Sequence, residues 1–253
     1  MRKTLYVSII TAVLITMTAF ISGCSKEVEN EGKTWEKVTI PWKDYEEARY
    51  SITNEGKPTA DVIHTIEKVS SNGQTTYKIN SNYMQKKGEY RTGAIVSYKN
   101  LKPISSFIYD NPGKADSKLV ELSGVYGEKL NITGKFGKET KSKSIKLPPV
   151  FYDNETLLHI PRVFPIKEDY SRRIRTCVLN SAAIEPFRIV VVGKEKVTVP
   201  AGTFKCFKVK LQYIGLTGYP NIYAWYTADS SKILVKYQQS KAMFKLKTVK
   251  YQK

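Results

Sequence analysis

The side chains best suited to acid–base or metal chemistry are few and scattered in this chain of 253 residues. Its two histidines, His64 and His159, lie far apart in the sequence and in unrelated contexts. The sequence has no nucleophile elbow, no H-E-x-x-H motif, no glycine-rich phosphate loop and no cluster with metal-ligand spacing. The fold could still assemble two carboxylate pairs, Asp153 with Glu155 and Glu168 with Asp169, but charged runs in loops are usually solvated. We therefore expect no enzymatic activity, no catalytic residues, no cofactor and no metal.

The cysteine with the most specific context is Cys24, which follows an export signal. A short basic start precedes the apolar stretch from Leu5 to Ile21, and two small residues separate that stretch from the cysteine. This order is typical of a secretory signal, and its end resembles the lipobox of bacterial lipoproteins. We expect residues 1–23 to be removed and Cys24 to be acylated. The alternative is an uncleaved membrane helix, because the stretch approaches the ~20 apolar residues that span a bilayer.

Acylation of Cys24 would hold the protein at a membrane surface, since each buried methylene contributes about 0.8 kcal/mol. Residues 24–43 are expected to form the lipidated N-terminus and a spacer, and residues 44–253 a single β domain. The rest of the chain then lies outside the cytoplasm, anchored to the cell envelope. If the host has two membranes, Ser25 favours the outer membrane, with the domain facing the periplasm.

The other two cysteines, Cys177 and Cys206, are expected in an oxidising compartment, which favours a disulfide. Neither belongs to a C-x-x-C motif or to a Cys/His cluster. The polar neighbours Arg175 and Lys208 place both cysteines toward the less buried side of their strands. A structural disulfide is one interpretation, and two free buried thiols are the other.

The charge of the chain is strongly positive, with 41 Lys and Arg against 23 Asp and Glu, a formal net charge of +18. Such a surface attracts anions. Nucleic acid is the usual partner of basic proteins, but an exported protein rarely meets it, so we expect an anionic envelope component instead. The candidate contacts are lysines on the polar faces of C-terminal strands: Lys208, Lys210, Lys236, Lys245 and Lys247. The alternative is that these lysines only form a solvated surface.

Apolar and polar residues alternate with a period of two through most of the chain, which predicts β-strands. Turn sequences rich in glycine, asparagine and proline separate the strands. Because these turns are short, the strands are expected to pair in an antiparallel meander. The predicted strands are residues 50–53, 61–69, 75–80, 93–98, 105–109, 118–126, 188–192, 197–199, 207–213, 222–227, 233–238 and 243–251.

Helix is scarce in this pattern. We expect one short helix at residues 44–50 and another at 152–160, the second capped by Asp153 or Asn154. Residues 138–149 are expected to be an exposed connection. The predicted fold is therefore mainly β, an antiparallel meander that forms a strongly curved sheet or open half-barrel with one or two short helices. One face of the sheet is expected to be apolar and the other lined by lysine.

The most specific motif is V-T-V-P-A-G-T-F, from Val197 to Phe204, which is followed by an alternating strand and by A-W-Y-T-A-D. With L-L-H-I-P-R-V-F-P from Leu157 to Pro165, it resembles the bacterial envelope family that carries the domain of unknown function 3108, over roughly residues 45–251. The resemblance implies a secreted or lipidated protein whose open β-barrel is similar to that of periplasmic lipoprotein carriers. Such a half-barrel wraps an apolar cavity that can hold an acyl chain. The family has no settled biochemical activity.

We therefore expect a membrane-anchored, non-enzymatic lipoprotein that binds a lipid or other amphiphile in an apolar cavity of its curved sheet. The alternative is a structural or interaction module that docks on an envelope complex or anionic polymer through its lysine-rich face. Trp225 is predicted to belong to the core rather than to a ligand site.

Overall fold

The computed structural model describes residues 32, 34–71, 73–85, 87–113, 119–216 and 218–252. The predicted signal peptide, Cys24 and the first part of the spacer lie outside the described residues. The described chain forms one sheet of 15 strands. The strands are β1 (Tyr45–Asn54), β2 (Lys57–Ser71), β3 (Gln74–Met84), β4 (Glu89–Ser97), β5 (Pro103–Asn111), β6 (Val120–Tyr126), β7 (Lys129–Phe136), β8 (Glu139–Lys146), β9 (Tyr152–Asp153), β10 (Ser171–Val178), β11 (Ala183–Val199), β12 (Gly202–Tyr213), β13 (Ile222–Thr227), β14 (Leu234–Gln239) and β15 (Ala242–Gln252).

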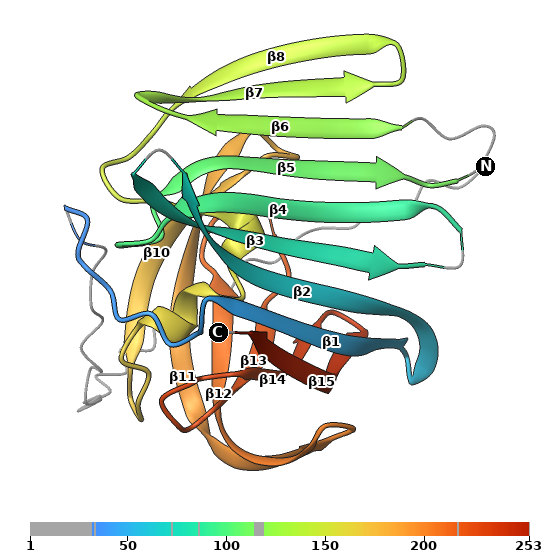
Figure 1. The fold of residues 1–253 in the computed structure, drawn as a ribbon, viewed down its shortest axis with the longest axis vertical. Helices are drawn as coiled ribbons and strands as arrows, with labels where there is room; N and C mark the ends of the chain where they lie inside the picture. The colour runs from blue at the N-terminus through green and yellow to red at the C-terminus, as the bar shows by residue number, and fades with distance from the viewer. Residues whose placement is uncertain are drawn as a thin grey trace, which may run out of the picture.

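The sheet has two halves, β1–β8 and β9–β15. They are joined where the first strand, β1, pairs with the last, β15. Its strand order runs from β8 back to β1, then through β15 down to β9. All neighbouring strands are antiparallel except β9 and β10, which are parallel. Among the described residues the two edge strands, β8 and β9, do not pair with each other, so the sheet stays open (Figure 1). This confirms the prediction of a strongly curved sheet or open half-barrel.

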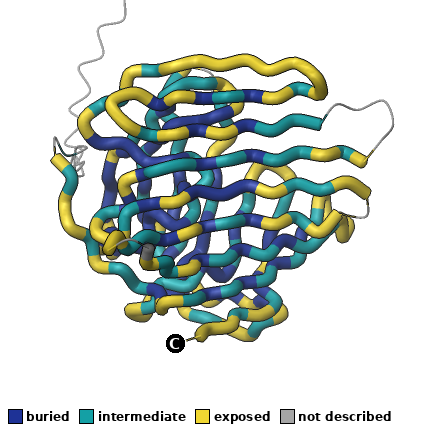
Figure 2. Tube along the Cα trace, turned by 45° about the horizontal axis from the view of Figure 1, so that its top comes forward, coloured by how far each residue is buried: buried dark blue, intermediate teal, exposed yellow. Residues whose placement is uncertain are grey.

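The sheet curls until its two halves face each other. Strands β10 and β11 pass behind strands β2 to β5 and across their direction (Figure 1). The edge strand β9 contacts β5, and a short 3-10 helix, η1 (Asn154–Thr156), lies between β3 and β4 on one side and β10 on the other. Buried residues alternate with less buried ones along the inner strands, whereas β8 is almost wholly exposed (Figure 2). The space inside the curl is thus where the two halves meet.

Two elements differ from the sequence prediction near the N-terminal half. The predicted helix at 44–50 is wrong, because this stretch belongs to β1, whose residues alternate between buried and half-buried positions. Neighbouring strands on both sides, β2 and β15, supply the hydrogen-bond partners that favour the extended form. The expected connection at 138–149 contains strand β8, which is exposed as predicted but is polar on both faces. Its sequence therefore lacks the alternation of apolar and polar residues from which the other strands were predicted.

The predicted helix at 152–160 is replaced by strand β9 and two short 3-10 helices, η1 and η2 (Ile160–Val163). Asp153 is the N-cap of η1, as the sequence suggested, because its side chain accepts a hydrogen bond from the backbone N–H of Glu155. Pro161 lies in the first turn of η2 rather than ending a helix. The described residues contain no α-helix, and no helix among them is long and apolar enough to cross a membrane.

A buried ion pair fixes η2 inside the curl. The guanidinium of Arg162 donates to both carboxylate oxygens of Glu46, at 2.6 and 2.8 Å, and to the backbone oxygen of Ser231 at 3.2 Å. The side chains of Arg162 and Glu46 are only 1% and 4% exposed. Arg162 also lies over the ring of Trp42, 5.1 Å from its centre. These contacts join β1, η2 and the turn between β13 and β14 at one point.

Candidate functional site

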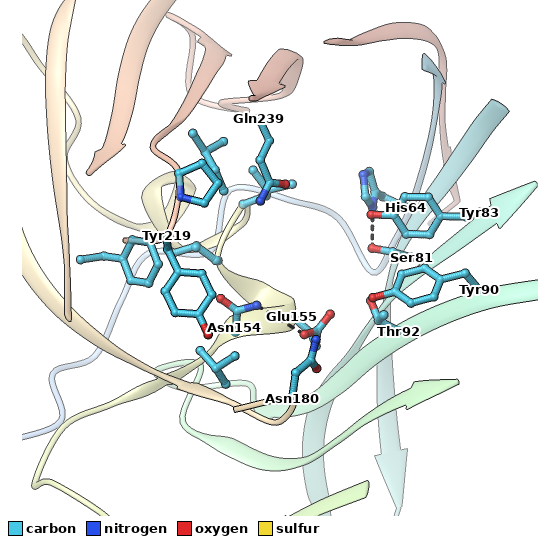
Figure 3. A pocket seen from close by; sticks show the side chains of 16 residues that line it. His64, Ser81, Tyr83, Tyr90, Thr92, Asn154, Glu155, Asn180, Tyr219 and Gln239 are labelled. Carbon is cyan, nitrogen blue, oxygen red and sulfur yellow. Dashed lines mark hydrogen bonds between the residues drawn. The ribbon is translucent and has the colours of Figure 1, made fainter. Parts of the chain in front are cut away.

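A cavity of about 280 Å³ lies between the two halves of the sheet. Strands β2, β3 and β4 supply one wall, and η1 lies at its base (Figure 3). The facing wall comes from the ends of β10, β11, β13 and β14 and from the loop between β12 and β13. The cavity therefore lies inside the curl, where the predicted fold would place a ligand.

The cavity lies toward the end of the fold where several turns gather. Tyr83 and Tyr90, which line it, form the last pair before the β3–β4 turn. Gln239 ends β14, and Tyr219 lies in the loop between β12 and β13. Because the strands are antiparallel neighbours, these turns share one end of the sheet. The N-terminal segment packs elsewhere, where Trp35 contacts the rings of Phe151 and Tyr152 edge-on, each at 5.6 Å.

The histidine in the cavity wall is held by two hydrogen bonds. His64 Nδ1 lies 2.7 Å from Ser81 Oγ, and Nε2 lies 3.0 Å from Tyr237 Oη. Burial lowers the pKa of His64 to about 4, so the ring is neutral at neutral pH. His159 lies close by, 5.9 Å away between ring centres, and burial also lowers its pKa. Both ring nitrogens of His64 are thus hydrogen-bonded within the wall, and its low pKa makes the ring a weak base at neutral pH.

Two carboxyl groups lie together at the base of the cavity. Asp153 accepts a hydrogen bond from Tyr126 Oη at 2.5 Å and another from the N–H of Glu155 at 2.7 Å. Burial raises the pKa of Asp153 to about 6, although these hydrogen bonds act to lower it. Burial, with the nearby charge of Asp153, raises the pKa of Glu155 to about 7. Glu155 lies among Asn154, Asn180 and Thr92 (Figure 3).

The structure thus places the two candidate carboxylate pairs in different surroundings. Asp153 and Glu155 are brought together inside the curl, whereas Glu168 and Asp169 lie exposed in the segment before β10. Leu157 and Leu158 of the cavity wall follow directly on Glu155. Within the described residues, no group of three or more His, Cys, Asp or Glu could hold a metal ion.

The cavity wall also includes an apolar set of side chains. It consists of Leu157, Leu158, Val178, Phe187 and Ile222. The cavity is therefore lined by side chains of both kinds, Glu155 among the polar ones and the leucines among the apolar ones. A molecule with both an alkyl chain and a polar group suits such a mixed lining.

Glu155 is expected to make the fold less stable as the pH rises. Its folded-state pKa of about 7 exceeds the ordinary value of 4.5, so between these values the folded protein keeps a proton that the unfolded chain releases. The stabilisation is complete below pH 4.5 and is lost as the pH rises through 7, a change on the order of 3 kcal/mol. His64 acts in the opposite direction between pH 4 and 6.5, since its pKa is lowered. Urea unfolding of wild type and Glu155→Gln across this pH range isolates the effect of Glu155. The free energy of unfolding of wild type minus that of the variant should fall as the pH rises. A difference that stays constant with pH would refute the prediction.

The candidate lysines lie on the face of the sheet opposite the cavity. The register aligns Lys208 with Trp225, Trp225 with Lys236, and Lys236 with Lys245, so the four side chains share one face. Ile222, which lines the cavity, is three residues from Trp225 and therefore points to the other face. The structure brings these three lysines into one row.

Trp225 lies within this row and also belongs to the buried apolar core, as predicted. The ammonium groups of Lys208 and Lys236 lie 5.2 and 3.7 Å from the centre of its ring, and its Nε1–H donates to Glu195 at 2.5 Å. Trp225 is nevertheless only 4% exposed, because these side chains cover it. It is buried as predicted, but on the lysine face.

Lys210 and Lys247 lie on the same side of the sheet, farther along their strands. Lys210 is aligned with Tyr223, and Lys247 forms an ion pair with Asp61 at 2.9 Å. Part of the lysine charge is therefore neutralised within the protein.

The predicted disulfide is wrong, and the other interpretation holds: Cys177 and Cys206 are free, buried thiols. Cys177 pairs with Ile184 at one end of β11, and Cys206 pairs with Glu195 near the other. At ~3.3 Å per residue, these positions are about 35 Å apart along the strand, whereas a disulfide needs Cα atoms within about 7 Å. The sequence pattern predicted two short strands, 188–192 and 197–199, where the structure has the single strand β11.

Thiol counting should therefore find two reactive groups at Cys177 and Cys206 when the mature chain is unfolded without a reductant. In the folded protein neither should react at mildly alkaline pH, because burial raises the pKa of Cys177 to about 12 and that of Cys206 to about 11. Cys177→Ser and Cys206→Ser provide the controls, each with one group fewer. Recovery of fewer than two groups at these positions from wild type would show a bond.

The comparisons with known proteins identify a family and one structure of similar fold, and they leave the activity open. A family model described as "Protein of unknown function (DUF3108)" matches residues 35–244. No curated protein sequence matches the chain. A β-barrel-like protein of the domain of unknown function DUF1849 from Brucella abortus has a TM-score of 0.54 and 11% identity, covering 85% of this chain and 100% of that one. A protein from Bacteroides fragilis with a YmcC-like fold has the same identity and coverage, with a TM-score of 0.36.

Proposed function

The chain belongs to the DUF3108 family of proteins of unknown function, and we propose that it is a non-enzymatic protein that binds a lipid or other amphiphile in the cavity of its curled sheet. The observation that carries this proposal is a cavity inside the curl whose wall combines apolar and polar side chains. Binding sites for small molecules are concave and mostly apolar, with a few polar groups that fix orientation. The volume of about 280 Å³ is at the lower end for such sites, which span roughly 300–1,000 Å³. A single-chain amphiphile suits it better than a lipid with several chains.

The chemistry of the wall supports binding rather than catalysis. His64 is hydrogen-bonded to Ser81 and Tyr237, but its pKa of about 4 makes it a weak base for either hydroxyl at neutral pH. Asp153 is occupied by Tyr126 and by the backbone of Glu155. The wall thus offers shape, hydrogen bonds and the carboxyl group of Glu155.

We test the proposal with the protein purified from its own host without denaturant. Native mass spectrometry should show a bound species whose mass matches a single-chain amphiphile, and extraction with organic solvent should release it. A displacement assay with a fluorescent alkyl probe then gives an affinity. A protein that carries no bound species and has no affinity for the probe would refute the proposal.

The proposed location is the cell envelope, with an acyl anchor at Cys24. The order of basic, apolar and small residues before this cysteine supports it. Mass spectrometry of the N-terminal peptide should find Cys24 as an acylated first residue, and Cys24→Ser should release the protein from membranes. An unmodified N-terminus at Met1 in membrane fractions would instead indicate an uncleaved helix. Membrane fractionation of the host would test placement in the outer membrane.

The row of Lys208, Lys236 and Lys245 supports a second candidate function, docking on an anionic polymer or envelope complex. Lys245 is exposed and Lys208 and Lys236 are half-buried, and binding through charges at the surface weakens as salt screens them. Retention on a polyphosphate matrix should therefore fall steeply between low and high salt, and the double variant Lys208→Gln, Lys236→Gln should be retained less than wild type. Lys135→Gln, on the other half of the sheet, is the matched control. Retention that salt or the double variant leaves unchanged would remove this candidate.

A further inference from the structure

Among the described residues, Glu155 is the one carboxylate that lines the cavity, and its position is fixed. It lies in η1, where Asp153 accepts a hydrogen bond from its backbone N–H at 2.7 Å. Its carboxylate lies beside Asn154, whose amide nitrogen is 3.5 Å from Oε1, and faces the space between the two walls (Figure 3). A ligand in the cavity would therefore meet this group directly.

The groups that face Glu155 bring no positive charge. Strands β2, β3 and β4 contribute His64, Tyr83, Tyr90 and Thr92, the β10–β11 turn contributes Asn180, and the β12–β13 loop contributes Tyr219. Burial raises the pKa of Tyr90 to about 12 and lowers that of His64 to about 4, so both are neutral near pH 7. Asp153, behind Glu155, adds negative charge when it is ionised. The described residues that line the cavity include no lysine and no arginine.

We infer that the amphiphile bound in this cavity carries a protonated amine as its polar group, which docks on Glu155 while the tail lies against Leu157, Leu158 and Phe187. The inference rests on the proposed function and names the class of its ligand. Glu155 is half-buried, and among the described residues that line the cavity no cation balances its charge. An ammonium group supplies that charge and donates hydrogen bonds to the carboxylate. A fatty acid would instead place a second negative charge beside Glu155 and Asp153.

Three alkyl probes with the same chain and different polar groups test this inference: a primary amine, an alcohol and a carboxylic acid. Their affinities are measured by displacement of a fluorescent alkyl probe, at a pH above the pKa of Glu155, on the full mature chain. We expect the amine to bind most tightly, the alcohol less and the carboxylate least. A charge-assisted hydrogen bond corresponds to a difference of about tenfold to a hundredfold in affinity between amine and alcohol.

The variant Glu155→Gln separates the carboxylate from the rest of the cavity. It keeps the shape of the side chain and should bring the amine and the alcohol to similar affinities, while the carboxylate gains. Glu168→Gln, which changes an exposed carboxylate outside the cavity, should retain the wild-type order. Urea unfolding of both variants confirms that they are folded.

The outcomes distinguish the inference from the function on which it rests. If none of the three probes binds wild type, the proposed function is refuted. If all three bind with equal affinity, or if Glu155→Gln retains the preference for the amine, the proposed function stands and the inference is overturned. Preference for the amine in wild type and Glu168→Gln, with its loss in Glu155→Gln, supports both.

Discussion

Replacing Arg162 with alanine is expected to lower the free energy of unfolding by about 3 to 5 kcal/mol. The cost arises because Glu46 is 4% exposed and would become a buried carboxylate without its partner. Arg162 also covers the ring of Trp42 and reaches the backbone of Ser231, so three segments lose a shared contact. Urea denaturation followed by tryptophan fluorescence measures the loss.

Two further variants show whether burial is the cause. Lys135 pairs with Glu121 at 3.4 Å on the surface, where both side chains are substantially exposed, and Lys135→Ala should cost at most about 1 kcal/mol. The double variant Arg162→Met, Glu46→Leu removes both charges and should cost less than Arg162→Ala, because no unpaired charge is left behind. A loss for Arg162→Ala no greater than that for Lys135→Ala would contradict this account.

Many strands could be predicted from the sequence where only one face of the sheet is buried, although β7, which alternates in the same way, was missed. In β12, Val209 and Leu211 are buried while Lys208 and Lys210 point to the other face, so the period of two is visible in the chain itself. Strands without that contrast were missed. β8 is polar on both faces, and β10 buries residues on both faces, including the polar Ser171 and Arg172.

The ion pair and the cavity could not be predicted in the same way, because they depend on residues that only the curl brings together. Glu46 and Arg162 are 116 positions apart, and nothing in either local sequence selects the other. The carboxylate pair at Asp153 and Glu155 was visible as a candidate, and the apolar Leu157 and Leu158 beside it were the available indication that it is not solvated. The distance between Cys177 and Cys206 could not be predicted either, because it depends on the length of β11. The turn residues in the sequence did not reveal that one continuous strand separates them.

Filling the cavity should abolish binding without unfolding the protein. Leu158 lines the apolar part of the wall, and Leu158→Trp would place a larger ring in the space proposed for the tail. Its backbone oxygen, which accepts the hydrogen bond of Tyr226 Oη at 2.8 Å, is unchanged by the substitution. Overpacking a filled core typically costs about 1–3 kcal/mol, and the cost should lie at the low end here because the cavity has room.

We therefore expect Leu158→Trp to weaken the binding of an alkyl probe by at least about tenfold, or 1.4 kcal/mol, while its unfolding stays cooperative in urea. Leu216→Trp is the matched control, since Leu216 is wholly exposed in the loop between β12 and β13, and it should bind as wild type does. Unchanged affinity in a folded Leu158→Trp protein would show that the tail lies elsewhere. Loss of binding in both variants would point to the loop as the entrance rather than to the cavity as the site, because the loop also carries Tyr219 of the cavity wall.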